Sequence, residues 1–251
     1  MTPFLHAIAG FNQSSGAPSF GDHAAKWWDS DGPMAPLHRL NPVRLDYVKE
    51  ILCAHFNRDA DQPQPLKGLR LLDIGCGGGL MTEPLTRLGA DITGIDASAE
   101  LIAVARKHAQ QQGLTIDYQD VLSSVLVKDK QKFDAVLALE VIEHVDNPAE
   151  LLADINALLK KNGVAILSTL NRTAKSFLGG IVAAEYLLRW VPRGTHAWDH
   201  FMKPSELATL AHQANLNPVA TMGLHYQPLQ QTFTLQADKL DINYFMVLAH
   251  A

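Results

Sequence analysis

A glycine-rich turn follows a short apolar run in "RLLDIGCGGGL", and its residue types indicate a ligand-binding loop. Gly75, Gly77 and Gly79 let the backbone pass very close to a bound molecule. Asp73 ends the apolar run before the loop, and Asp96 ends the next apolar run. A carboxylate at the second position can accept hydrogen bonds from both hydroxyls of a ribose. This spacing indicates a nucleotide-binding strand–helix–strand unit.

The glycine spacing also narrows the choice of nucleotide. A dinucleotide fingerprint requires glycine at its sixth position, where this chain has Leu80. No Lys-Ser or Lys-Thr pair follows the loop, so a phosphate-binding P-loop is excluded. The residues fit a ligand that has a ribose, no phosphate and a charged end near the loop. S-adenosylmethionine meets that description.

A second group of chemically useful side chains lies in "ALEVIEHVDNP". If this segment opens a helical turn, offsets of three and four residues place Glu140, Glu143 and His144 on one face. Two carboxylates and an imidazole can bind a hard divalent cation, or the histidine can act as a general base. In a third interpretation, the two acids only favour the start of a helix. These residues alone leave all three interpretations open.

The bulk composition is that of a globular α/β protein. The chain has 251 residues, of which 47% are hydrophobic and 19% charged, so it can bury a sizeable core. A formal net charge of -5 argues against nucleic acid as a partner, because phosphate binding requires a basic surface. Two cysteines, Cys53 and Cys76, are too few for a disulfide framework and fit a reducing compartment.

The N-terminus predicts a disordered tail over residues 1–20. This stretch contains no Lys or Arg and turns polar after a short apolar start, unlike a secretory signal. No apolar run in the chain approaches the ~18 residues of a membrane-spanning helix. We therefore predict a cytoplasmic protein with one domain over residues 21–251.

Apolar runs alternate with helical patterns in the centre of the chain. Strands are expected at 69–75, 91–96, 115–120, 133–140 and 163–170. Helices are expected at 80–88, 99–111 and 148–159. This alternation predicts parallel strands joined by right-handed crossovers, in a doubly wound, Rossmann-like sheet.

Other elements are expected at both ends of this pattern. A helical cap over residues 21–66 precedes it, with Asn41 as the expected N-cap and Pro42 as the first helical residue. An insertion over residues 171–203 follows it. A helix from Pro204 to Ala214 and two strands in an antiparallel edge hairpin complete the expected fold.

The loop and strand pattern resembles the class I S-adenosylmethionine-dependent methyltransferases. For this chain the resemblance implies a seven-stranded sheet in the order 3-2-1-4-5-7-6, with the last strand antiparallel. Longer stretches make the resemblance more specific, among them "KWWDSDGPMAPLHRLNPVRLDYV", "LEVIEHV", "STLNRT", "AAEYLLRWVPRGTH" and "DINYF". From Lys26 to Tyr244 the chain is similar to the O-methyltransferases of ubiquinone biosynthesis.

This closer resemblance implies a substrate class and site residues. The implied substrates are polyprenylated, namely 2-polyprenyl-6-hydroxyphenol and 3-demethylubiquinol, and association with other ubiquinone-biosynthesis proteins is also implied. The resemblance assigns donor binding to Arg44, Gly75, Asp96 and Leu139, to which the loop pattern adds Asp73 and Gly77. In the eukaryotic relatives magnesium is associated with the cluster that matches Glu140, Glu143 and His144.

The reaction itself requires a base. Methyl transfer from a sulfonium is an in-line displacement, so the enzyme must bring a phenolate oxygen close to the methyl carbon. A phenol has a pKa of about 10 and is mostly protonated at neutral pH. His144 is the predicted base, or a metal ligand that serves the same end.

The insertion contains the apolar segment "SFLGGIVAAEYLLRWVPRG". One interpretation is a lid helix whose apolar side covers the active site. In the other, residues 175–193 contact a membrane surface, with Trp190 and the basic residues Lys175, Arg189 and Arg193 at the level of the headgroups. The two interpretations are compatible. Two alternative functions also stay open, an O-methyltransferase for another small phenol or acid and a non-catalytic scaffold of a ubiquinone-biosynthesis assembly.

Overall fold

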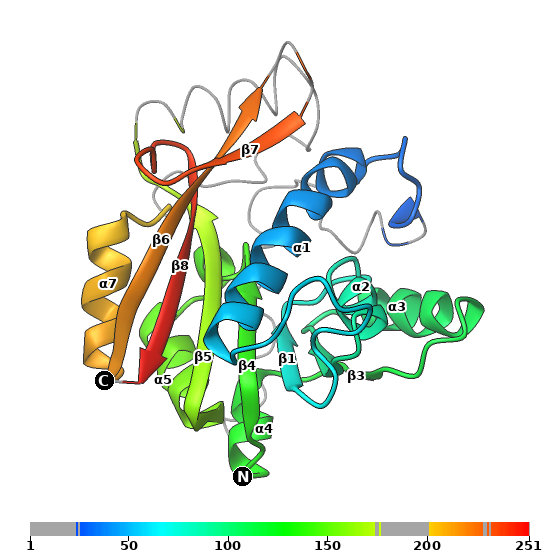
Figure 1. The fold of residues 1–251 in the computed structure, drawn as a ribbon. Helices are drawn as coiled ribbons and strands as arrows, with labels where there is room; N and C mark the ends of the chain where they lie inside the picture. Colours follow the sequence, from blue (N-terminus) through cyan, green and yellow to red (C-terminus); the bar gives the residue numbers. More distant parts are fainter. Residues whose placement is uncertain are drawn as a thin grey trace, which may run out of the picture.

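One mixed sheet runs through the part of the chain that the structure, a computed structural model, describes (Figure 1). The described residues are 24, 26–173, 176, 201–227, 230 and 232–250. The strands are β1 (Arg70–Ile74), β2 (Asp91–Ile95), β3 (Asp117–Gln119), β4 (Phe133–Leu139), β5 (Leu159–Leu170), β6 (Leu216–Gln227), β7 (Thr232–Gln236) and β8 (Asn243–His250). The helices are α1 (Ala35–His55), α2 (Thr82–Arg87), α3 (Ala99–Gln111), α4 (Ser123–Lys128), the 3-10 helix η2 (Ile142–His144), α5 (Pro148–Leu158) and α7 (Pro204–Gln213).

The first five strands are parallel, which confirms the doubly wound prediction. β1 lies at the centre of this half and pairs with β2 on one side and β4 on the other. Its last residue, Ile74, is level with Ile95 of β2 and Ala138 of β4. The loops that follow these three strands therefore begin side by side at one edge of the sheet, where parallel sheets bind their ligands.

The other half of the sheet is antiparallel and has one strand more than expected. The full order is β3-β2-β1-β4-β5-β8-β6-β7, so the expected order holds with β8 in the place of the seventh strand. The count of seven is wrong, because the C-terminal region forms three strands rather than two. β7 pairs with the end of β6, from Gly223 opposite Gln236 to Gln227 opposite Thr232, and satisfies backbone groups that β6 would otherwise leave at an open edge.

Helices cover both faces of the sheet. α5 and α7 pack on one face through fully buried residues such as Leu152 and Leu207. α1 and α2 pack on the other through Leu52 and Leu85, and Figure 1 shows α1 crossing that face. These two clusters form the core and hold the loop edge of the parallel strands in place.

The start of α1 differs from the prediction. The helix begins at Ala35 rather than after Asn41, with Pro36 in its first turn and Pro42 inside it. Asn41 is not a cap, because it lies inside the helix, and its Nδ2 donates to the carbonyl of Leu80 at 2.7 Å. The cap of α3 is confirmed, since Ser98 Oγ accepts a hydrogen bond from the amide of Leu101.

Several predicted features lie outside the described residues. These are the 1–20 tail and nearly all of the apolar segment 175–193, including Lys175, Arg189, Trp190 and Arg193. The lid and the membrane contact therefore stay predictions. Among the residues that are described, no helix is long and apolar enough to cross a membrane.

Candidate active site

The glycine loop is fixed to the end of β2 by backbone hydrogen bonds. The amides of Gly75 and Cys76 both donate to the carbonyl of Ile95, at 2.8 and 3.0 Å. The amide of Gly77 donates to Asp96 Oδ2 at 2.9 Å, and the amide of Ser98 donates to Asp96 Oδ1 at 2.8 Å. Asp96 thus connects the loop after β1 to the start of α3.

Gly75 cannot be replaced without strain. Its φ is +68°, and a Cβ there would lie 2.4 Å from Val141 Cγ2. Val141 belongs to the segment between β4 and η2, so the absence of a side chain at Gly75 lets the loops after β1 and β4 approach closely. Both loops line the same part of the sheet edge.

Asp73 is buried below the loop. It is 2% exposed, and its Oδ2 accepts a hydrogen bond from Thr82 Oγ1 at 2.6 Å. Burial raises the pKa of Asp73 to about 7, and the nearby Asp96 adds to this shift while Arg44 and Thr82 oppose it. Asp96 and Arg44 therefore lie close enough to Asp73 to affect its charge.

Arg44 reaches the end of β4 from α1. Its Nη2 lies 3.0 Å from Glu140 Oε1, and its side chain is 10% exposed. Arg44 Nε is buried and has no hydrogen-bond partner among the described residues. A buried guanidinium with an unused N–H can donate a charge-assisted hydrogen bond to a ligand carboxylate.

Glu140 is held by three side chains in an unusual backbone conformation. Its φ is +57°, which non-glycine residues rarely adopt. Besides the ion pair with Arg44, its Oε1 accepts hydrogen bonds from Ser168 Oγ at 2.8 Å and Asn243 Nδ2 at 2.9 Å. Burial opposes ionisation, but Arg44 and these two donors outweigh it and hold the pKa of Glu140 below its usual value.

Glu143 has the opposite protonation preference. It is 3% exposed, and its Oε2 accepts a hydrogen bond from Thr169 Oγ1 at 2.8 Å. Burial and the adjacent charge of Glu140 raise the pKa of Glu143 well above its usual value. The pKa values of the two carboxyls therefore shift in opposite directions, as expected for like charges that lie close together in a buried site.

This arrangement does not fit the magnesium site implied by the resemblance. Glu140 is paired with Arg44, and Glu143 is buried with its Oε2 bound by Thr169 and its charged form disfavoured, so neither offers a free carboxylate to a cation. No three His, Cys, Asp or Glu side chains within the described ranges are grouped as metal ligands. Glu140 also precedes η2 rather than belonging to it, so the three residues do not share one helical face.

Comparison with known proteins agrees with this geometry. Residues 44–221 match a family model described as "Methyltransferase domain". Ubiquinone biosynthesis O-methyltransferases are similar over most of their length: that of Dinoroseobacter shibae is 49% identical over 88% of this chain and 89% of the relative. That of Brucella ovis is 46% identical over 92% of both chains. The chain belongs to the ubiquinone biosynthesis O-methyltransferases.

Solved structures support the fold of this ubiquinone biosynthesis O-methyltransferase. Magnesium protoporphyrin IX methyltransferase from Synechocystis, solved with bound SAH, has a TM-score of 0.62 at 18% identity and covers 93% of this chain and 95% of its own. A possible histamine N-methyltransferase from Thermotoga maritima also has a TM-score of 0.62, at 18% identity, over 92% of this chain and 98% of its own. At these identities the likeness concerns the fold.

The remaining predicted residues lie at the same edge of the sheet. Leu139 is the last residue of β4 and is partly buried, and His144 is the half-buried last residue of η2. In this methyltransferase the predicted donor residues lie at or just after the ends of β1, β2 and β4 or, for Arg44, come from α1. Their roles stay proposals.

Sequence analysis missed the residues that support these side chains. They are Thr82, Ser168, Thr169 and Asn243, each a hydrogen-bond partner of one of the buried acids. Three of them lie in stretches quoted for the family resemblance, "STLNRT" and "DINYF". The family resemblance pointed to these stretches, but it did not indicate which acid each hydroxyl or amide would contact.

Proposed function

We propose that this enzyme transfers the methyl group of S-adenosylmethionine to ring hydroxyls of 2-polyprenyl-6-hydroxyphenol and of 3-demethylubiquinol. The family membership supports O-methylation in ubiquinone biosynthesis. The observation that carries the proposal is the convergence of three side chains, Asp73 near the end of β1, Asp96 just after β2 and Arg44 from the middle of α1. Two acids and one cation are the charges required by a ribose and an amino acid in one ligand.

Each donor-binding residue has a distinct role in this proposal. Asp96 accepts hydrogen bonds from the ribose hydroxyls while it keeps the Gly77 amide in place. The free Nε–H of Arg44 binds the donor's carboxylate, and Asp73 lies near the donor's positive charge. Gly75 and Gly77 leave room for the ligand, and Leu139 contacts the adenine.

The chemical step forms a carbon–oxygen bond and breaks a sulfur–carbon bond. A ring oxygen attacks the methyl carbon in line with the sulfur, and the sulfonium leaves as the neutral thioether of S-adenosylhomocysteine. The hydroxyl proton must leave the ring oxygen, and His144 accepts it. The protein's own contribution is to align the two ligands, exclude water and provide this base.

The direct test is methyl transfer from labelled S-adenosylmethionine to short-chain forms of both substrates. We expect activity on both, and activity on neither would contradict the substrate assignment. Other small phenols assayed in parallel test the alternative substrate class, and donor binding without any transfer would favour the scaffold.

The same assay with EDTA and with added magnesium tests whether the reaction requires the cation. Activity lost in EDTA and restored by magnesium would make Glu140, Glu143 and His144 ligands despite their present pairing.

Two variants separate binding from chemistry. Asp96→Ala should weaken donor binding by about 100-fold, because two hydrogen bonds to a charged group are lost. His144→Ala should leave donor affinity unchanged and lower kcat by about 100-fold, the usual contribution of a general base. Calorimetry with S-adenosylhomocysteine measures the first effect and initial rates measure the second. An unchanged kcat in His144→Ala would rule out this histidine as the base.

A further inference from the structure

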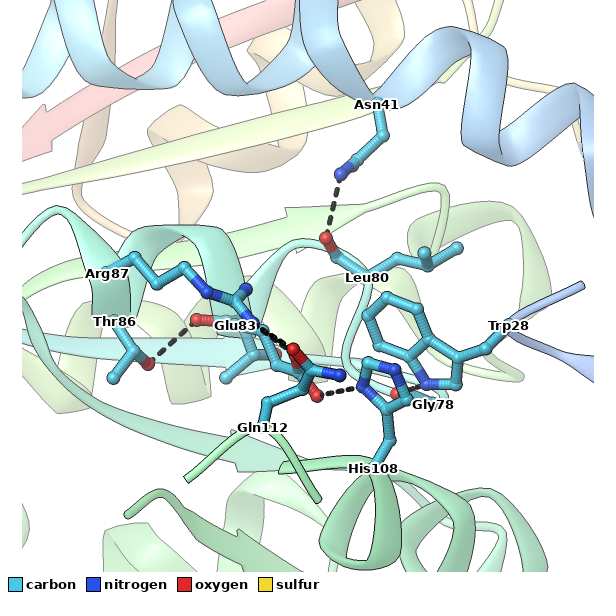
Figure 2. A network of polar contacts seen from close by, with 10 residues as sticks. Trp28, Asn41, Gly78, Leu80, Glu83, Thr86, Arg87, His108 and Gln112 are labelled. Atoms are coloured by element: carbon cyan, nitrogen blue, oxygen red, sulfur yellow. Dashed lines mark hydrogen bonds and ion pairs between the residues drawn. The ribbon is translucent and has the colours of Figure 1, made fainter. Parts of the chain in front are cut away.

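A network outside the proposed chemistry joins the N-terminal segment to the glycine loop (Figure 2). Trp28 Nε1 donates a hydrogen bond to the carbonyl of Gly78 at 3.0 Å. The imidazole of His108, from the last turn of α3, stacks on the Trp28 ring with centroids 3.6 Å apart and planes 9° apart. On its other side, His108 Nδ1 lies 2.6 Å from Glu83 Oε1 of α2.

The buried acid gives this network its rigidity. Glu83 is fully buried, and an ionised carboxylate in such a place requires charged or hydrogen-bonding partners. It has two, His108 at Oε1 and Arg87 at Oε2, the latter at 3.4 Å. The contact between His108 Nδ1 and Glu83 Oε1 fixes the plane of the ring that Trp28 stacks on.

The contact with Gly78 acts on the loop that we assign to the methyl donor. The carbonyl of Gly78 and the amide of Gly79 share one rigid peptide plane. The Gly79 amide donates to the carbonyl of Cys76 at 3.0 Å and closes the turn that contains Gly77. Fixing the Gly78 carbonyl through Trp28 therefore fixes the orientation of the turn itself.

Neighbouring contacts reinforce the same connection. The Trp27 ring lies directly on the loop, since a Cβ at Gly77 or Gly78 would be 2.6 or 2.3 Å from its atoms. His38 Nε2, from α1, lies 2.8 Å from the carbonyl of Trp27. Two α1 residues, His38 and Asn41, thus support the segment and the loop, the second through Leu80.

We infer that Trp28, His108 and Glu83 form a clamp whose function is to position the glycine loop for donor binding. The three are positioning residues, because none of them belongs to the proposed donor contacts or to the acid pair. The clamp joins α2, α3 and the segment before α1, which are brought together only in the folded chain. This inference rests on the proposed donor site at the loop.

The test is a separation of KM from kcat in His108 variants of the full-length enzyme. His108→Ala removes both the stacked ring and the partner of Glu83, and should raise the KM for S-adenosylmethionine and the Kd for S-adenosylhomocysteine about ten-fold. The kcat at saturating donor should stay within about two-fold, because the reacting groups are untouched. His108→Asn keeps a donor near the Nδ1 position and should recover part of the affinity.

The matched control is His212→Ala. His212 also lies in the last turn of its helix and contacts one side chain, Asn217 Oδ1 at 3.0 Å, but it is on α7. The His212→Ala change should leave the KM for S-adenosylmethionine unchanged. If His108→Ala does not fold, Trp28→Phe keeps an aromatic ring and removes only the bond to Gly78, and it should weaken donor binding in the same way.

Two outcomes distinguish failure of the clamp from failure of the donor site. If Asp96→Ala weakens donor binding but His108→Ala and Trp28→Phe do not, the clamp has no role in positioning the loop and the inference is overturned. If Asp96→Ala itself leaves donor binding unchanged, the donor site is wrongly placed, and the inference falls with it. A fall in kcat at unchanged KM in the His108 variants would also overturn the inference.

Discussion

At the scale of single residues, Asp73 and Asp96 show how surroundings set the behaviour of one functional group. Burial raises the pKa of both carboxyls. At Asp96 this is opposed by backbone amides, including those of Ser98 and Gly77, whereas Asp73 has Thr82 as its hydrogen-bond donor. Asp96 is therefore suited to accept hydrogen bonds as an anion, and Asp73 changes charge near neutral pH.

The raised pKa of Asp73 predicts a pH-dependent loss of stability. Its folded pKa of about 7 lies above the ordinary value of 3.8, so the folded state binds more protons between these values. The free energy of unfolding should then fall as pH rises from about 4 to about 7, by roughly 4 kcal/mol from this group alone. Asp73→Asn should lack this component and be the more stable protein at pH 8. Urea unfolding of both proteins at several pH values measures it, and parallel curves would contradict the assignment.

At the scale of elements, the ion pair between Arg44 and Glu140 connects α1 to the residue that follows β4. Both side chains are largely buried, at 10% and 21% exposed. Removing one partner of a buried pair leaves the other charge uncompensated, which costs more than the pair contributes. The junction between helix and sheet therefore depends on both charges being present together.

Arg44→Met should lower the free energy of unfolding by about 3 kcal/mol. Adding Glu140→Gln should recover part of this loss, because the isolated negative charge is then removed. Lys49→Met, on the same helix, is the control: its pair with Glu50 spans 3.6 Å and Glu50 is 64% exposed, so about 0.5 kcal/mol is expected. Guanidinium unfolding of the four proteins gives the comparison, and equal losses at positions 44 and 49 would show that burial of the pair is unimportant.

At the scale of the whole molecule, both cysteines are buried, Cys53 in the cluster below α1 and α2 and Cys76 in a smaller cluster that includes residues of α3. Cys53 and Cys76 are 2% and 7% exposed, and burial raises the pKa of each thiol. They lie in separate apolar clusters and are both free. The fold is therefore stabilised without a disulfide, as the low cysteine count predicted.

This burial predicts unreactive thiols in the native protein. A thiol reagent such as DTNB should modify neither cysteine rapidly under native conditions, because the reactive thiolate is both scarce and inaccessible. Both should react at once in guanidinium. Rapid reaction of one thiol in the native state would show that the cluster around it opens readily.

Local patterns predicted the parallel half of the fold well. β1, β2 and β4 fall within the expected ranges, and the Ser98 cap is confirmed, because each depends on apolar runs and turn residues that are close in sequence. The start of α1 and the third C-terminal strand were not predicted. β7 depends on its pairing with the distant β6, and Asn41 lies inside α1, where its side chain contacts the distant Leu80.

What the sequence determined by itself is the chemistry available at the ends of β1, β2 and β4. The glycine spacing, Asp73, Asp96 and the Glu140 to His144 cluster can be found by residue type and register alone. Only the tertiary structure decided which of these groups are charged and what they contact. Arg44 pairs with Glu140, burial and the charge of Glu140 raise the pKa of Glu143, and His108 joins Trp28 to Glu83. Burial and partners from distant segments set these properties, and neither can be read from neighbours along the chain.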